Sequence, residues 1–171
     1  MDKYKAEPLS RAAIRNYVKH LKCIVGLDKV LMFPIMLFLE NIIPILIPDF
    51  QLEILTKEEM GIKHGETYPN RNLIRIREDV YERAVAGIPR DRLTIAHEIG
   101  HLFLHDKNAI ALCRTEPGET LNAYEDPEWQ ADCFAGELLA SFYLIKGMSE
   151  QEVMKSCNVS AQAAHLLVSK L

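Results

Sequence analysis

The sequence predicts an α+β domain in which a small sheet accompanies a majority of helices. Two short segments, Gln51–Leu55 and Leu73–Arg77, have the composition and alternation of strands. Two longer segments have helical spacing: one around Thr94–Leu102 that contains His-Glu-x-x-His, and one over Glu128–Leu139 with an apolar stripe. Together these four segments predict the fold class and place the polar motifs on helices.

The N-terminal part is expected to be helical and to lie outside a membrane. An amphipathic helix from about Ser10 to Val25 precedes an apolar stretch, Val30–Phe50. Three prolines and Glu40 interrupt that stretch, whereas a helix that spans a bilayer needs about 20 predominantly apolar residues. We therefore expect a buried helix from roughly Leu31 to Glu40 and no membrane association.

The middle of the chain is expected to connect the strands and helices by turns. Gly65–Asn72 has the composition of a turn between the two strands, and Val80–Ala86 that of a short helix closed by Gly87. Residues 106–127 form a long polar connection that contains two prolines and a glycine. A connection of that length is often functional, and here we expect it to border a cleft.

The last part of the chain, residues 148–171, resembles a helix-turn-helix. Its two helices meet at a tight turn, Cys157-Asn158-Val159, and Ser160 is the expected N-cap of the second. Two glutamates and two lysines in this segment sum to zero charge. DNA binding relies on cations that contact phosphates. We therefore favour a structural or partner-binding role here and no direct contact with nucleic acid.

Length and composition fit a single domain of 171 residues with three parts: N-terminal helices (1–50), a core that contains His-Glu-x-x-His (51–147) and the helix-turn-helix-like element (148–171). The net charge of −4 gives no basic excess that would indicate nucleic acid or an anionic membrane. Four widely spaced cysteines and the absence of a convincing secretory signal favour a reduced, cytoplasmic protein. The oligomeric state is left open.

The motif His97-Glu98-x-x-His101 has the spacing of a zinc site. Because each helical residue turns by about 100°, His97 and His101 lie within about 40° of each other on the helix surface. Two imidazoles on one face can hold one Zn²⁺, and Glu98 is the candidate general base. Asp91 is a candidate N-cap for this helix.

A third ligand is expected from the second helix. Glu128 and Asp132 are four residues apart, so both carboxylates project from one side of it. One of them can complete a site of two histidines and one carboxylate, and the other can accept the free N–H of a ligating imidazole. The fourth zinc position would hold a catalytic water. This pattern does not decide which acid has which role.

Three further sets of residues could contribute to the site. His105, one turn beyond His101, could face the cleft or end the helix, and the helix-end role is favoured. Tyr124 and His105 are weak candidates for stabilising the transition state. The expected strand offers an edge along which an extended substrate could add as another strand; its residues are Asn72, Leu73, Ile74, Arg75 and Ile76.

The run Thr94-Ile95-Ala96-His97-Glu98-Ile99-Gly100-His101, the pattern from Glu128 to Leu139 and the turn Asn158-Val159-Ser160-x-x-Ala163 resemble the ImmA/IrrE family of zinc metallopeptidases. The resemblance covers most of the chain and implies a zincin-like fold. It also implies zinc ligands His97, His101 and Glu128, a catalytic Glu98, and a supporting carboxylate at Asp132.

The resemblance further implies a function. The family includes proteases that cleave helix-turn-helix repressors, and this chain looks most like its short members, the anti-repressors of mobile genetic elements. The chain departs from the family pattern in two places. Leu139-Ala140-Ser141 stands where Leu-Met-Pro often ends the second motif, and His165 stands where the family commonly has a basic residue, arginine. The alternative is a regulator that binds a partner or DNA and has a vestigial or structural zinc site.

Overall fold

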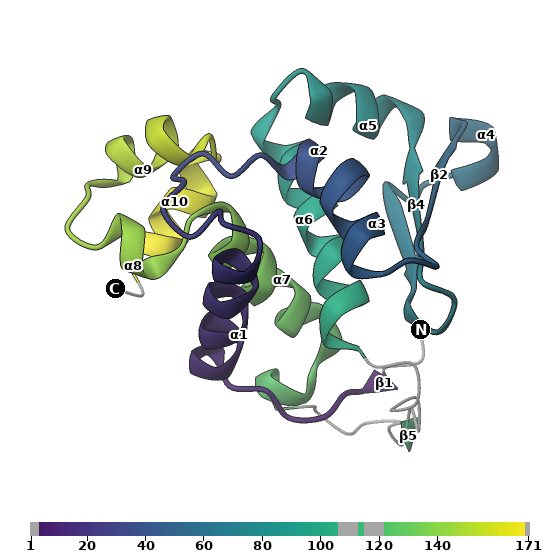
Figure 1. The fold of residues 1–171 in the computed structure, drawn as a ribbon, viewed down its shortest axis with the longest axis horizontal. Helices are drawn as coiled ribbons and strands as arrows, with labels where there is room; N and C mark the ends of the chain where they lie inside the picture. Colours follow the sequence, from purple (N-terminus) through teal and green to yellow (C-terminus); the bar gives the residue numbers. More distant parts are fainter. Residues whose placement is uncertain (1–3, 106–112, 115–121, 170–171) are drawn as a thin grey trace.

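The fold is described by a computed structural model for residues 4–105, 113–114 and 122–169 (Figure 1). Most of the described chain is helical, and a three-stranded sheet lies at one side of the molecule. A second, two-residue pairing joins β1 (Tyr4–Lys5) to β5 (Cys113–Arg114). The prediction of an α+β fold with a small sheet is confirmed.

The first helix, α1 (Arg11–Ile24), begins where the sequence predicts. The Ser10 hydroxyl accepts a hydrogen bond from the Ala13 amide at 3.1 Å, which satisfies one of the amides that have no partner within the helix. Ile14 and Val18 lie on its buried face. This face packs against α7 (Pro127–Leu139).

The apolar stretch folds differently from the expected helix over Leu31–Glu40. It forms α2 (Ile35–Leu37), a π-helical turn η1 (Phe38–Ile42) and α3 (Ile43–Leu46). The helix begins only after Pro34, because the helical conformation is disfavoured at Phe33, the residue before this proline. Pro44 has no amide to donate, and the Ile43 amide reaches back five residues to the Phe38 carbonyl. The helix therefore continues through Pro44 by a local change of register.

The main sheet has the order β2-β4-β3. Strand β2 (Gln51–Leu55) pairs in parallel with β4 (Leu73–Arg77), and β3 (Gly65–Tyr68) pairs with β4 in the antiparallel direction. The expectation that residues 65–72 form only a turn was wrong. Four of them are a strand, and the return to β4 is made by η2 (Pro69–Arg71).

The turn before β4 is closed by Asn72, whose backbone is left-handed with φ +49°. Asparagine tolerates that conformation better than most residues. The N–H of Asn72 bonds to the Pro69 carbonyl at 3.2 Å, and its carbonyl accepts from the Gln51 amide at 2.8 Å. Asn72 therefore ties the turn to the start of β2.

The remaining elements are all helical. They are α4 (Lys57–Met60), α5 (Glu78–Val85), α6 (Pro89–Leu104), η3 (Ala123–Glu125), α7, α8 (Phe142–Ile145), α9 (Glu150–Cys157) and α10 (Ala161–Val168). The last two form the expected helix-turn-helix-like element. Asn158 ends α9 in the left-handed conformation, and Ser160 caps α10.

The core lies between α6, α7 and the inner face of the sheet. Fully buried side chains from all three meet there, including Ile76 of β4, Ile99 of α6 and Phe134 of α7. Figure 1 shows α6 and α7 in the middle of the molecule, with the sheet on one side and α8–α10 on the other. The segments predicted to carry the polar motifs are therefore the two central helices.

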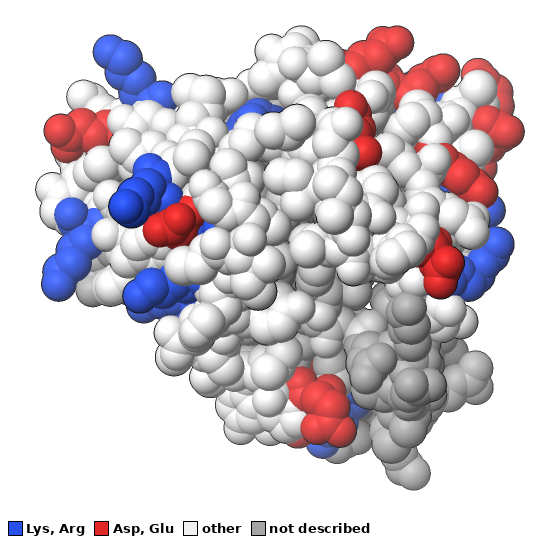
Figure 2. Space-filling model, viewed as in Figure 1, with Lys and Arg blue, Asp and Glu red and all other residues white. Residues whose placement is uncertain are grey.

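The charged side chains are unevenly spread on the face seen in Figure 2. Asp and Glu gather over α4 and α5, Lys and Arg over the opposite end of the molecule, and a wide uncharged area lies between them. Within the described part of the chain, no helix is long and apolar enough to cross a bilayer.

Lys22 is completely buried at the end of α1. Its ammonium lies 2.7 Å from the Ser141 hydroxyl and 4.8 Å from the centre of the Phe33 ring. Burial disfavours the charged form and outweighs nearby negative groups, so the pKa of Lys22 falls to about 8. Because the Ser141 hydroxyl also donates to the Glu137 carbonyl, removing the ammonium leaves that hydroxyl with a partner.

We expect Lys22→Met to raise the free energy of unfolding at pH 7 by about 1 kcal/mol or more. Between pH 8 and pH 10.5 the unfolded wild type holds a proton on Lys22 that the folded protein has lost, so wild-type stability rises with pH there. Urea unfolding over this range should show the advantage of Lys22→Met shrinking. A constant difference from pH 7 to 10.5 would show that Lys22 does not titrate as described.

Candidate metal centre

The two central helices approach each other closely at a glycine. A Cβ atom added to Gly100 of α6 would lie 3.1 Å from the Cα and the carbonyl oxygen of Ala131 and 3.2 Å from the Phe134 Cβ. This is tighter than ordinary van der Waals contact, so a larger residue at 100 would separate α6 from α7. The small side chains at positions 100 and 131 therefore bring the faces of the two motifs together.

Potential ligand atoms from three residues meet at this crossing. Nε2 of His97 lies 2.9 Å from Nε2 of His101 and 3.2 Å from Oε2 of Glu128, and Nε2 of His101 lies 3.5 Å from Oε1 of Glu128. Zinc with bonds of about 2.0–2.2 Å and tetrahedral angles separates its ligand atoms by roughly 3.4 Å. The donor types and their spacing therefore fit a divalent metal such as zinc.

The start of α7 sets the direction of the candidate carboxylate ligand, Glu128. Asp126 is the N-cap and accepts a hydrogen bond from the Glu128 amide at 3.0 Å, while Pro127 occupies the first helical position. Hydrogen bonds from His101 and His97 lower the pKa of Glu128, and burial opposes this only in part. Glu128 is thus an anionic oxygen donor pointing at both imidazoles.

Asp132 contacts the other side of His97. Its Oδ1 lies 2.8 Å from His97 Nδ1. Burial would lower the pKa of His97, but hydrogen bonds to Asp132 and Glu128 more than offset it and raise the pKa to about 10. Because a carboxylate only accepts hydrogen bonds, Nδ1 must carry a proton, which directs Nε2 toward the metal position. Of the two acids whose roles the spacing left open, Glu128 therefore lies where a ligand would, and Asp132 lies behind His97.

Glu98 is held on the sheet side of the motif. It is only 8 % exposed, and one of its carboxylate oxygens lies 2.6 Å from the Thr67 hydroxyl of β3. Gly65 of the same strand lies against its side chain, where a Cβ would come within 2.7 Å of Glu98 Cγ and Oε1. Burial raises the pKa of Glu98, and the Thr67 hydrogen bond and the two histidines offset part of this rise.

His105 ends the helix, the position that the sequence favoured, and it also contacts a candidate ligand. It is the C-cap of α6, and its Nδ1 lies 3.0 Å from His101 Nδ1. Its Nε2 lies 3.1 Å from Oε1 of Gln130, a fully buried side chain of α7. Burial, reinforced by the charge of His101, lowers the pKa of His105 to about 4. His105 is therefore a neutral imidazole packed behind one of the candidate ligands.

Two other expectations about the site were not met. The strand that includes Leu73–Ile76 is the central strand of the sheet and is hydrogen-bonded on both sides, so it offers no edge to a substrate. The strand with an outer edge beside Glu98 is β3. Asp91 is not an N-cap either: α6 begins at Pro89, and the Asp91 carboxylate pairs with Arg83 at 2.9 Å.

Tyr124 meets the site through its backbone. Its side chain is 47 % exposed, and its carbonyl accepts hydrogen bonds from the Leu9 amide at 2.9 Å and from Gln130 Nε2 at 2.8 Å. The described contacts therefore give the Tyr124 phenol no part in the arrangement. Most of the connection 106–127, which was expected to border the cleft, lies outside the described residues.

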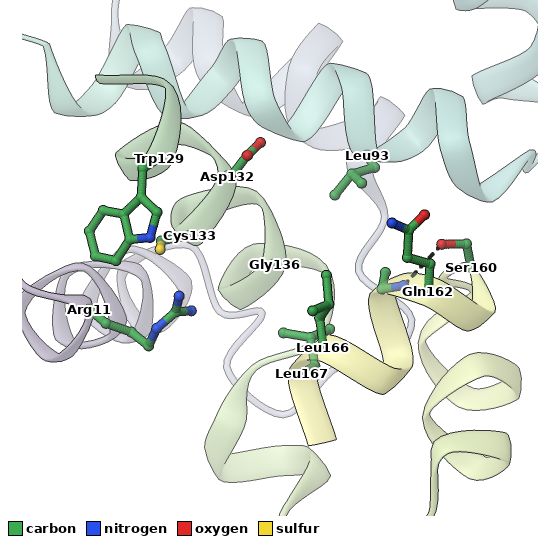
Figure 3. A pocket seen from close by; sticks show the side chains of 11 residues that line it. Arg11, Leu93, Trp129, Asp132, Cys133, Gly136, Ser160, Gln162, Leu166 and Leu167 are labelled. Carbon is green, nitrogen blue, oxygen red and sulfur yellow. Dashed lines mark hydrogen bonds between the residues drawn. The ribbon is translucent and has the colours of Figure 1, made fainter. Parts of the chain in front are cut away.

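A pocket of about 310 Å³ adjoins the candidate metal centre (Figure 3). It lies between α1, α6, α7 and α10, and its lining includes Arg11, Leu93, Trp129, Asp132 and Leu166. Most of its exposed wall is apolar. Leu93 is one helical turn before His97, and Asp132 also bonds to His97, so the pocket begins directly beside the histidine motif.

Three residues of this site escaped the sequence analysis. Gly65 and Thr67 belong to a segment whose glycine, proline and asparagine predict a turn, so nothing placed them beside Glu98. Gln130 lies about 200° around the helix from Glu128, on the side predicted to be core. The one signal in the sequence was that Gln130, a polar residue, lies beside the apolar stripe of α7, where a buried side chain needs hydrogen-bond partners.

Two histidines one turn apart on a helix, a glutamate between them and a carboxylate from the next helix define the metallopeptidase class of site. The family model of the IrrE N-terminal-like domain, a peptidase family designated M78, matches residues 56–166, which is well over half of the chain. The chain belongs to this family, and the predicted resemblance is confirmed. No curated protein matches the chain at a significant level.

Proposed function

We propose that this protein is a zinc-dependent endopeptidase whose substrate is a helix-turn-helix transcriptional repressor. The observation that carries the proposal is the convergence of His97, His101 and Glu128, whose donor atoms all lie within 4.8 Å of one another. Membership of a metallopeptidase family supports the activity. The repressor as substrate rests on family-level analogy, and an intracellular repressor would place the enzyme in the cytoplasm.

In this proposal His97, His101 and Glu128 hold the metal. A zinc ion bound there would polarise the scissile carbonyl and lower the pKa of a bound water. Asp132 holds the His97 ring with Nε2 directed at the metal position. The open side of the three ligands is left for water and substrate.

Glu98 is the proposed general base. It would accept the proton of the attacking water and return it to the leaving amine. Burial raises its pKa toward the pH range in which a carboxylate can do both, and Thr67 holds the carboxylate in one orientation. The outer edge of β3 lies beside Glu98, and an extended substrate could pair with it through main-chain hydrogen bonds.

The proposal is tested by metal content and cleavage together. Purified protein should contain about one zinc per chain, and it should cut the helix-turn-helix repressor encoded beside its gene. A chelator should stop the cutting, and added zinc should restore it. His97→Ala should lose both zinc and activity, whereas His20→Ala, at an exposed position of α1, should keep both.

The outcomes separate the proposal from its alternative. Zinc binding and chelator-sensitive cutting of another protein would keep the peptidase and replace the substrate. Failure to bind zinc, together with tight binding of a partner or of DNA, would replace the enzyme by a non-catalytic regulator.

A further inference from the structure

A chain of hydrogen-bonding groups continues from His101 into the core on the side away from Glu128. It runs from His101 Nδ1 to His105 Nδ1 at 3.0 Å and from His105 Nε2 to Gln130 Oε1 at 3.1 Å. It ends at two backbone carbonyls that accept from Gln130 Nε2, those of Glu7 at 2.7 Å and Tyr124 at 2.8 Å. The direction of every bond in this chain can be worked out from its end.

The two carbonyls fix the orientation of the Gln130 amide. A carbonyl oxygen only accepts, so the group that faces both Glu7 and Tyr124 must be the NH₂ of Gln130. Its oxygen then faces His105. Gln130 has no exposed surface, so water does not offer the flipped amide other partners.

The amide oxygen of Gln130 in turn fixes the tautomer of His105. Among its described side-chain partners His105 faces an amide oxygen and another imidazole but no carboxylate, so none of them is an anion that would hold a second proton on its ring. Because the amide oxygen only accepts, the single ring proton must be on Nε2, and Nδ1 carries a lone pair. That lone pair faces His101 Nδ1 and requires a proton there. A neutral His101 with its proton on Nδ1 has its own lone pair on Nε2, the atom that faces His97 and Glu128.

We infer that His105 and Gln130 are a positioning pair that holds His101 in the tautomer whose Nε2 can bind the metal. This inference rests on the proposed zinc site. It gives each histidine its own acceptor behind Nδ1: the exposed carboxylate of Asp132 for His97 and the partly buried imidazole of His105 for His101.

The neutral acceptor has a chemical consequence. Asp132 already places one carboxylate behind His97. Another carboxylate behind His101 would add a further negative charge close to Glu128 and Glu98, whereas His105 directs the His101 ring without adding charge. Gln130 donates hydrogen bonds to two backbone carbonyls from separate segments. The orientation of His105 therefore also depends on the N-terminal segment at Glu7 and on η3 at Tyr124. Neither His105 nor Gln130 contacts the place of the substrate in this scheme, so both are positioning residues.

The decisive test is the tautomeric state of the histidines in the zinc-loaded wild-type protein, read from long-range ¹⁵N–¹H NMR correlations. We expect His105 to be neutral with its proton on Nε2, and His101 to carry its proton on Nδ1. A proton on Nδ1 of His105, or on both of its nitrogens, would overturn the inference. This measurement needs no variant, so it stands even if a substituted protein folds poorly.

A variant then tests whether the pair matters for metal binding. Gln130→Met keeps the length of the side chain and removes the amide oxygen. We expect the Kd for zinc, measured by competition with a chelating dye, to rise about 10–100-fold. The NMR signals of His105 should show a mixture of tautomers. Gln151→Met, the same change at an exposed position of α9, should alter neither quantity.

The two proposals fail in different ways. Unchanged zinc affinity and an unchanged His105 tautomer in a folded Gln130→Met would overturn the positioning pair while leaving the zinc site intact. A wild-type protein that binds no zinc would instead refute the proposed function.

Discussion

Glu98→Gln should retain one zinc per chain and lose about 10²–10⁴-fold in kcat/KM for the cleaved substrate. The substitution keeps the shape of the side chain and leaves an amide oxygen that can still accept from the Thr67 hydroxyl. It removes the basic carboxylate. The proposed ligand atoms belong to His97, His101 and Glu128, so the proposed metal position is not altered directly.

The control is Glu58→Gln, the same change at an exposed position of α4. Zinc content by mass spectrometry, unfolding temperature and cleavage rate should be measured on all three proteins. Unimpaired cleavage by Glu98→Gln would show that the base lies elsewhere. Joint loss of zinc and activity would make Glu98 a structural part of the site rather than its base.

The candidate ligands could be predicted from the sequence because their geometry is local. His97 and His101, like Glu128 and Asp132, are pairs on single helices, and helical spacing alone places each pair on one face. The crossing that brings the two faces together depends on the contact of Gly100 with Ala131. That contact is a tertiary one that periodicity does not describe, and the family resemblance implied a shared zinc site without showing how the two helices meet.

The surroundings of the ligands could not be predicted because they depend on backbone groups and on a misjudged segment. Gln130 acts by contacting carbonyls of Glu7 and Tyr124, which have no signature in the side-chain sequence. The segment from Gly65 combines strand residues with a glycine that looks like a turn signal. That glycine is needed for another reason: the Glu98 side chain occupies the space of its missing Cβ.

Gly65→Ala should also have a large effect on activity. In Gly65→Ala the new Cβ would lie 2.7 Å from Glu98 Cγ and Oε1, closer than real Cβ contacts allow. The backbone at 65 is an ordinary strand, so alanine itself is accommodated there. The Glu98 side chain is the flexible partner and should move. Because misplacement of a reacting group by about 1 Å can cost 10²-fold, we expect a loss of about that size in kcat with zinc retained.

Glu66→Ala is the matched control, because the side chain of Glu66 lies on the other face of β3 and pairs with Lys63. It should keep its zinc and nearly all its activity. A crystal structure of Gly65→Ala should show the Glu98 carboxylate displaced from Thr67. If that carboxylate keeps its hydrogen bond and activity stays at the wild-type level, the strand rather than Glu98 has given way. In that case the glycine does not determine where the base lies.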